Sequence, residues 1–149
     1  MNNTRRRQIK KELKTLETIQ QLVEGYCEQY NGKVVSEEEV GIIMDALEDA
    51  SSLLSDISMT IDDLEMEERD CFDNLPESLQ MAEKGEAMEM AADNLETARD
   101  CVDDAASNVD DVVSDLEDYD SESELDVDFS SISDSIEEAI DALNEAMES

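Results

Sequence analysis

The stretch SNVDDVVSDLEDYD, residues 107–120, decides the fold class, because apolar residues recur in it every three or four positions between six acidic ones. A helix places apolar residues with this spacing on one stripe and the carboxylates on its outer side. Three other segments repeat apolar residues with the same period. We therefore expect an all-α fold, an antiparallel helical bundle with coiled-coil seams. The expected helices cover residues 5–30, 37–72, 77–119 and 129–147, and an acidic linker covers residues 120–128.

Composition supports the same fold class. The chain has 149 residues, which is the size of one ordinary domain. Apolar residues make up 40 % of it and aromatic residues only 3 %, with four glycines and one proline. This composition does not suit a β-sandwich or a barrel, so we expect a single helical domain whose core is Leu, Ile, Val, Met and Ala.

Local features predict the helix ends. The pair Asn31-Gly32 ends the first helix, and Ser36 with Glu39 forms a capping box that starts the second. Pro76 separates the second helix from the third. These two long helices form a hairpin of about 50 Å, whose apolar face narrows toward the proline. We expect the narrow part to project from a four-helix body as a two-helix arm.

Charge is the most informative property of the chain. The formal net charge is −33 at pH 7, from 43 acidic and ten basic residues. Residues 1–35 carry seven of the cations and four acids, a net of +3, which leaves −36 on the remainder. Like charge at that density destabilises a compact state and repels nucleic acid and anionic membranes. We therefore expect no nucleic-acid or membrane partner, and instead a basic partner or cations.

Residue types exclude most catalytic and cofactor classes. The chain has no histidine, no glycine-rich phosphate loop and no GxSxG motif. Its three cysteines, Cys27, Cys71 and Cys101, lie far apart and lack metal-site spacing, which favours reduced thiols in a cytoplasmic protein. No apolar run approaches the ~20 residues of a membrane span. We expect no enzyme activity, no cofactor and no bound metal.

One acidic segment has the spacing of a calcium loop. Ligand-type residues fall at five positions of an EF-hand pattern that starts at Asp126. The turn position that needs glycine is Ser131, and the apolar residues after it belong to a helix. We therefore favour a role for Asp128 or Ser130 as the helix cap. The five residues are Asp126, Asp128, Ser130, Asp134 and Glu137.

Acidic residues form regular rows on the third expected helix. Five recur at strict seven-residue spacing, and three more form a neighbouring row. A charged row is commonly a solvated face, but about 33 excess charges along roughly 50 Å give one per ~1.5 Å, close to the one per ~1.7 Å of duplex DNA. The rows are Glu89, Glu96, Asp103, Asp110 and Glu117, and Glu86, Asp93 and Asp100, with Asp56, Asp62 and Asp63 of the second helix adding to the field.

In length, helical pattern and acidity, the whole chain resembles bacteriophage DNA-mimic proteins, which occupy the DNA groove of restriction enzymes or other host defence proteins. The stretch DNLPESLQ, residues 73–80, followed by EKGEAMEMAADNLETA, residues 83–98, is similar to a segment of small uncharacterised helical proteins from phages and prophages of Gram-positive bacteria. The first resemblance implies an inhibitor of a defence protein. The second implies an origin in a mobile element and brings no functional residues.

We predict a DNA mimic that inhibits a host protein by binding its basic DNA-binding surface, above all that of a defence nuclease. The alternative is an acidic coiled-coil adaptor whose partner is another helical protein and whose charge keeps it soluble. Met59 and Met66 bear on this choice, because they lie seven apart on the side of their helix opposite its seam. They either form an adaptable binding patch or lie under another helix.

The basic segment at the start of the chain departs from a uniformly acidic mimic. We expect it to pair with the acidic body, in the same chain or in a second copy, and not to bind DNA. If the first helix packs antiparallel to the second, its cations approach the acids near residues 56–65. These cations are Arg5, Arg6, Arg7, Lys10, Lys11 and Lys14, and the acids are Asp56, Asp62, Asp63 and Glu65.

Overall fold

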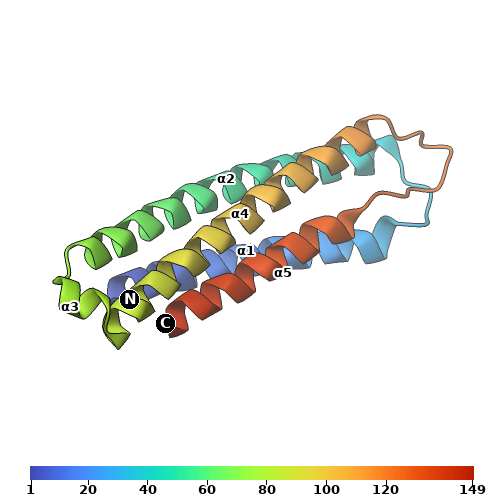
Figure 1. The fold of residues 1–149 in the computed structure, drawn as a ribbon. Helices are drawn as coiled ribbons and strands as arrows, with labels where there is room; N and C mark the ends of the chain where they lie inside the picture. The colour runs from blue at the N-terminus through green and yellow to red at the C-terminus, as the bar shows by residue number, and fades with distance from the viewer.

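The computed structural model describes residues 1–149, and every regular element in it is a helix (Figure 1). The expectation of an all-α bundle is confirmed. Strand-like pairing is limited to one isolated bridge between Val34 and Glu124. The helices are α1 (Asn3–Tyr30), α2 (Glu37–Asp73), α3 (Glu77–Gln80), α4 (Glu83–Glu117) and α5 (Phe129–Glu148).

The four long helices run up and down in turn, so that successive long helices are antiparallel (Figure 1). Helix α4 packs against both α2 and α5, whereas α1 packs mainly on α5 and makes a much smaller contact with α2. Both long connections lie at one end of the bundle, and α3 lies at the other end with both termini. We call the half of the bundle nearer the first end the loop half (residues 17–60 and 101–138). The half nearer the second end is the tip half (residues 1–16, 61–100 and 139–149).

The helix ends form where local sequence predicts them. Helix α1 ends before Asn31, and Gly32 takes a positive φ of 81°, which glycine adopts without steric cost. The Ser36 side chain caps α2 by accepting a hydrogen bond from the Glu39 N–H (3.2 Å). Asp128 caps α5 through the backbone N–H three residues later (3.1 Å), and the chain is already helical from residue 129. The acidic segment with calcium-loop spacing is thus a capped helix start.

The segment expected as one helix over residues 77–119 is two helices, α3 and α4, with a break at residues 81–82. Close packing at this corner requires glycine, because a Cβ on Gly85 would lie 2.2 Å from the backbone oxygen of Gln80. The Gln80 side chain also donates to the Phe72 carbonyl (3.1 Å) and joins α3 to the end of α2. A lone glycine in the sequence marks a weak helix start, but it does not reveal this corner.

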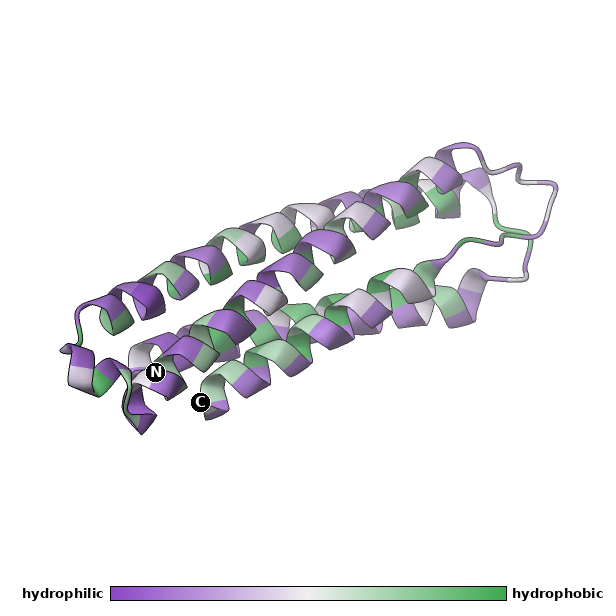
Figure 2. Ribbon diagram, in the orientation of Figure 1, coloured by the Kyte–Doolittle hydropathy of each residue, from purple (hydrophilic) through white to green (hydrophobic).

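Aliphatic residues fill the core between the four long helices (Figure 2). The two predicted seams are buried from Val40 to Leu64 on α2 and from Ala91 to Leu116 on α4. The long helices are therefore mainly apolar on their inner sides, and none of them combines the length and the apolar character that a bilayer crossing requires.

No long two-helix arm projects from the body. Helix α1 runs beside α2 almost to the end of α2, where Arg5 Nε donates to the buried Glu68 carboxylate (2.8 Å). The end of α5 reaches the same level, and the Met147 carbonyl accepts a hydrogen bond from Arg6 Nε (3.0 Å). The expectation of an arm is wrong because α1 and α5 extend to this level, where a charged contact that hydrophobic spacing does not reveal holds α1 against α2.

Hydrogen bonds join the two loops at the loop end, and we call this contact the loop stitch. The Gly32 N–H donates to the Leu125 carbonyl (2.8 Å), and the Leu125 N–H donates to the Lys33 carbonyl (2.7 Å). The Asn31 side chain donates to the Val127 carbonyl (2.9 Å) and accepts from the Val127 N–H (3.2 Å). Because Leu125 is also fully buried, the acidic linker is held against the bundle.

Candidate partner-binding surface

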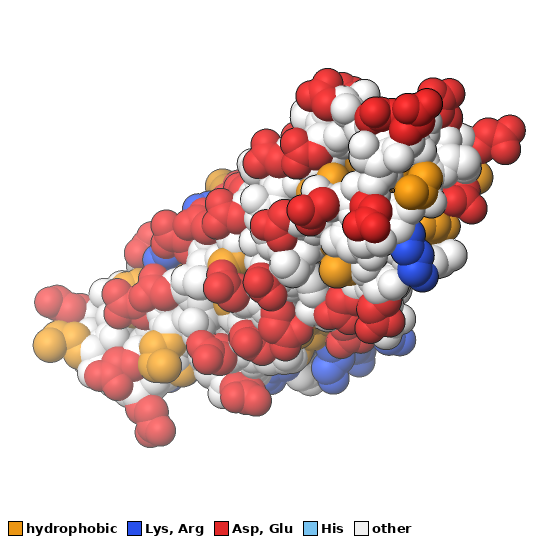
Figure 3. Space-filling model, turned by 90° about the vertical axis from the view of Figure 1, so that its right-hand side faces the viewer, with side chains coloured by type: hydrophobic (Ala, Val, Ile, Leu, Met, Phe, Trp, Pro, Cys, Tyr) orange, Lys and Arg blue, Asp and Glu red, His pale blue; other side chains and the backbone are white.

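The predicted acidic rows lie on the exposed positions of α4. The seams of this helix face α2 and α5, so the remaining positions point outward. Seen from the loop end, carboxylates spread over the visible surface, and the few cations lie at its edges (Figure 3). The exposed row members are Glu86, Glu89, Asp93, Glu96, Asp100, Asp103, Asp110 and Glu117.

The longer of these rows follows the contact line between α4 and α2. Ser58 Oγ donates to Asp103 (2.6 Å), and Ser51 Oγ donates to Asp110 (3.3 Å). Both pairs are seven residues apart on their helices, so two antiparallel rows meet along the seam. The serines orient these two carboxylates at the surface without neutralising them.

Arg69 of α2 neutralises two members of the rows. Its guanidinium contacts Asp93 (3.3 Å) and Glu96 (3.0 Å) across the seam, and Glu65 (2.8 Å) on its own helix. The hydrogen bond with Glu65 outweighs partial burial and raises the pKa of Arg69. Asp93 and Glu96 are therefore partners of an arginine, which the charge pattern of α4 alone does not show.

Whereas Arg69 reaches from α2 to α4, Arg99 makes similar contacts from α4 to α2. It contacts Asp62 (2.7 Å) and Glu65 (2.9 Å) on α2, and Asp100 (3.3 Å) beside it. The hydrogen bond with Asp62 raises the pKa of Arg99 despite some desolvation. Glu65 is only 7 % exposed and lies between two guanidinium groups. Asp62 and Asp100 are therefore compensated acids as well.

A further outward row on α4 is not among the rows predicted from the sequence. Asp104 and Asp111 of α4 and its C-cap residue Asp118 recur every seven residues and are all exposed. They make none of the ion pairs of the chain, which all involve Arg5, Arg69 or Arg99. The seven-residue spacing reveals this row, although the uncharged Met90 and Thr97 interrupt it in the first half of the helix.

Acids and cations are divided unequally between the two halves. The loop half contains 25 acidic residues and one cation, Lys33, a net of −24. The tip half contains 18 acidic residues and nine cations, a net of −9. The uncompensated negative field is therefore concentrated at the loop half, where α4 and its C-cap carry Asp103, Asp104, Asp110, Asp111, Asp115, Glu117 and Asp118.

The predicted residues of α2 divide in a similar way. Asp56 and Asp63 are exposed, seven residues apart, and outside every ion pair of the chain. Asp62 is half-buried and held by Arg99. Only the first two therefore add free charge to the surface.

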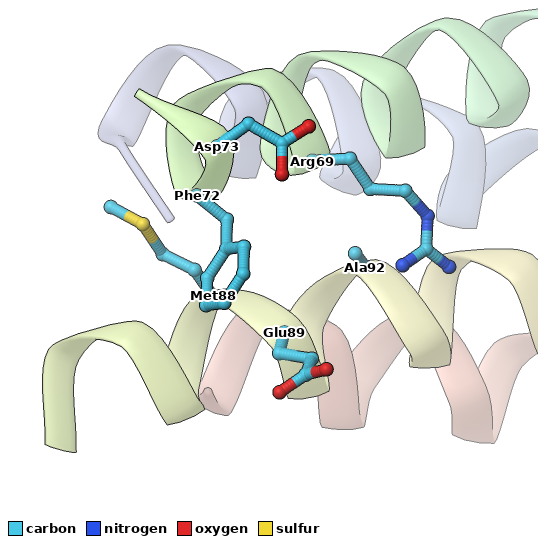
Figure 4. A pocket seen from close by; sticks show the side chains of 6 residues that line it. All are labelled: Arg69, Phe72, Asp73, Met88, Glu89 and Ala92. Carbon is cyan, nitrogen blue, oxygen red and sulfur yellow. The ribbon is translucent and has the colours of Figure 1, made fainter. Parts of the chain in front are cut away.

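A small cavity marks the end of the long acidic row in the tip half (Figure 4). It has a volume of about 240 Å³ and lies between the end of α2 and the start of α4. Phe72 and Met88 lie close together at one side of it, while the Arg69 guanidinium points away from them. Glu89 lines the same cavity but forms no ion pair with Arg69. In this row, the first acid that Arg69 neutralises is therefore Glu96, two turns after Glu89.

The first cation of the basic segment docks in its own chain. Arg5 contacts Glu68 (2.8 Å) and Glu67 (3.5 Å), about one turn beyond the acids expected as its partners. Burial opposes the charge of Arg5, but the hydrogen bond and the attraction of Glu68 raise its pKa. Glu68 is fully buried, and its Oε2 has no hydrogen-bond partner. Arg5 is therefore the main compensation for a buried carboxylate.

The two methionines of α2 are exposed. Met59 is 67 % exposed and Met66 is 58 % exposed, on a side of α2 that no other helix of the chain covers. Of the two interpretations, cover by another helix of this chain is excluded.

Comparisons with known proteins add no homologue to this description. No protein-family model, curated protein or solved structure matches the chain. The charge and geometry of the surface therefore provide the evidence for its function.

Proposed function

We propose that this protein is a phage- or prophage-encoded DNA mimic that inhibits a host defence or DNA-processing protein by binding its basic DNA-binding surface. The observation that carries the proposal is the loop half, where 25 acids accompany a single cation. Self-repulsion at this density destabilises folding, so a purely solubilising role accounts poorly for it.

The dimensions of the bundle support this proposal. The 37 residues of α2 span about 55 Å, so a net charge of −33 gives about one charge per 1.7 Å, the axial charge spacing of duplex DNA. Four helices arranged in two layers have a cross-section of roughly 20 Å. A channel shaped for a duplex therefore accepts an object of similar width and charge.

The acidic surface is also held in place before binding. Ser58 and Ser51 orient two carboxylates of α4, and the loop stitch holds the acidic linker. Preorganised charge avoids part of the ordering cost of association. A mimic of this kind associates rapidly with a basic channel, and its affinity falls steeply as salt rises.

A capture experiment tests the proposal. The immobilised protein is exposed to a bacterial lysate, and bound proteins are eluted with fragments of duplex DNA. Elution by DNA, together with loss of binding at high salt, is the expected result. A captured partner that DNA does not displace, and that high salt does not release, would contradict mimicry.

Two matched variants then locate the binding surface, because each removes three negative charges from α4. One neutralises the uncompensated row, and the other neutralises acids that are already paired with arginine. The first should weaken partner binding about tenfold or more, and the second should have a much smaller effect. The variants are Asp104→Asn/Asp111→Asn/Asp118→Asn and Asp93→Asn/Glu96→Gln/Asp100→Asn.

The exposed methionines keep an adaptor as the second candidate function. Met side chains adapt to varied apolar surfaces, and Met59 with Met66 presents such a patch on α2. Replacing both with Gln should abolish the binding of a helical partner but leave a DNA mimic active. Neutralising the acidic row of α4 should instead disable a DNA mimic and leave the binding of a helical partner unchanged.

A further inference from the structure

The cavity between the end of α2 and the start of α4 has the walls of a pocket for one side chain (Figure 4). Its volume of about 240 Å³ is smaller than that of pockets for drug-sized ligands and suits a single long side chain. Phe72, Met88 and Ala92 provide its apolar lining. An aromatic ring and a thioether pack well against methylene groups, and the face of the ring also attracts a cation. These walls favour a ligand with an alkyl stem and a cationic end.

Two unpaired carboxylates stand at the same cavity, one on each helix. Asp73 is the last residue of α2, and Glu89 lies on the second turn of α4 (Figure 4). Both are exposed, and neither belongs to an ion pair of the chain. Lys84, on the first turn of α4, does not line the cavity. The two acids are therefore free to contact a cation from outside.

The end of α2 adds to the negative potential at the cavity. This helix ends at Asp73, and its last turn contains no basic residue. The carbonyl end of a helix carries a partial negative charge that stabilises a cation within about one turn. The Gln80 side-chain amide donates to the Phe72 carbonyl (3.1 Å), but a neutral amide supplies no charge. The backbone therefore favours a cation here as well.

Arg69 is the one cation that lines the cavity, and its charge is already compensated. Its guanidinium points away from the apolar walls (Figure 4) and contacts three carboxylates. Arg69 and Arg99 together contact five carboxylates, which leaves a net charge of −3 on this group. The surroundings of the cavity are therefore negative despite Arg69.

We propose that this cavity binds the guanidinium of an arginine side chain of the partner; the source of that side chain rests on the proposed function. A guanidinium is more weakly hydrated than an ammonium group, stacks on aromatic rings and can contact two carboxylates with its planar set of donors. Arginine is also enriched among the residues that contribute most to interface energies. Glu89 begins the acidic row that continues along α4 to Glu117, so the cavity anchors one end of a basic surface that follows this row.

An NMR titration with a small probe tests the pocket without a partner. N-acetyl-arginine amide is added to the full chain, whose methionine methyl groups are isotope-labelled, at about 0.15 M NaCl to screen non-specific attraction. We expect a saturable shift of the Met88 methyl signal with a Kd on the order of 1 mM. The methyl signal of Met90, which is 59 % exposed on α4 and outside the cavity, should shift much less. The neutral citrulline analogue should bind at least about tenfold more weakly, because it has the shape of arginine without the charge.

Two variants and a matched control assign the response to the named walls. Phe72→Leu removes the ring, Asp73→Asn/Glu89→Gln removes the two free carboxylates, and each should weaken probe binding about fivefold or more. Asp70→Asn/Glu86→Gln removes the same charge three residues earlier on each helix, outside the cavity, and should leave the Kd within about twofold. Circular dichroism checks that every variant remains helical.

Equal shifts of Met88 and Met90, or wild-type binding of the probe by both variants of the cavity, would overturn the proposed pocket. The captured partner gives a separate readout, because Phe72→Leu should weaken its binding about tenfold. An unchanged affinity for a partner that DNA displaces would show that mimicry holds and that the cavity is outside the interface. A partner that DNA does not displace would contradict mimicry, whereas a selective response of Met88 to the probe would still support a guanidinium site.

Discussion

The loop half and the tip half consist of the same four long helices but differ in how charge is arranged. In the tip half, Arg69 and Arg99 bridge acids across the α2/α4 seam, and Arg5 compensates the buried Glu68. In the loop half, Lys33 is the single cation, and the acids of α4 face serines of α2. Charge thus joins helices in one half and is displayed to solvent in the other.

Apolar packing in the loop half compensates for the repulsion between its unpaired acids. The loop half contains Phe129, which is fully buried beside Tyr26, and the buried Leu125 of the linker. Aromatic side chains bury large apolar areas, and this burial offsets the repulsion between nearby carboxylates. The tip half has a single aromatic residue, Phe72, which is half-buried. The ion pairs of the tip half therefore make a larger contribution to its cohesion. Dense uncompensated charge is thus tolerated in the half whose core contains the buried aromatic side chain.

Removal of Arg5 is the test of this comparison with the largest expected effect. Arg5→Met leaves the fully buried Glu68 carboxylate without its cation and should lower the free energy of unfolding by about 3–5 kcal/mol. Urea denaturation measures the change. Arg7→Met is the matched control and should change stability by less than about 0.5 kcal/mol, because Arg7 is exposed and unpaired.

The second test compares two glycines. Gly85→Ala places a Cβ 2.2 Å from a backbone oxygen at the α3/α4 corner and should destabilise the tip half by about 1–3 kcal/mol. In the loop half, Gly25→Ala meets no atom within 4 Å in a helix interior and should stabilise by about 0.5–1 kcal/mol. The melting temperatures of the two variants should therefore shift in opposite directions. An unchanged melting temperature for Gly85→Ala would mean that the corner adjusts easily.

Glu12 provides a smaller, pH-dependent test. Burial raises its pKa, with nearby Asp56 adding to the shift, so the folded state binds a proton there more readily than the unfolded state. Ionised Glu12 therefore destabilises the fold at neutral pH, and Glu12→Gln should stabilise it by about 1 kcal/mol at pH 7. The gain should shrink as pH falls through the raised pKa and vanish below the ordinary glutamate pKa of about 4.3. A gain that does not change with pH would contradict this cause.

The smallest test uses the matched triple variants of α4. At low salt, neutralising Asp104, Asp111 and Asp118 should stabilise the chain by a few tenths of a kcal/mol per site, because like charges repel along the helix. Neutralising Asp93, Glu96 and Asp100 should instead destabilise it slightly, because Arg69 and Arg99 lose partners. At high salt the melting temperatures of the two variants should converge, because both effects are screened. Equal shifts at low salt would show that the two halves do not differ electrostatically.

The sequence is sufficient to predict the features of the fold that depend on local spacing. The α2 and α4 seams follow a seven-residue period, and Ser36 and Gly32 act within one turn of their own helices. The failure of the arm prediction has a different cause, because the position of α1 depends on a contact between Arg5 and Glu68, 63 residues apart. The α3/α4 corner likewise depends on how closely Gly85 approaches Gln80.

The candidate surface is predictable to a similar extent. Helical spacing places the acidic rows of α4 on exposed positions, as the structure has them. It does not show which of these acids are compensated, because Arg69 and Asp93 are 24 residues apart, and Arg99 and Asp62 are 37 apart. Compensation depends on the packing of α2 against α4, so free and paired acids are indistinguishable in the sequence.

The loop stitch has a consequence for the order of folding. It joins Asn31 to Val127, 96 residues apart, whereas the hairpin of α2 and α4 closes through much shorter loops. Non-local contacts form after the entropy of closing long loops has been overcome, so we expect the stitch to form late in folding and to open early in unfolding. The amides of Gly32 and Leu125 donate the hydrogen bonds of the stitch, and their hydrogen exchange reports when it opens. Faster exchange there than in the middle of α4 would show that the acidic end opens while the helices remain folded.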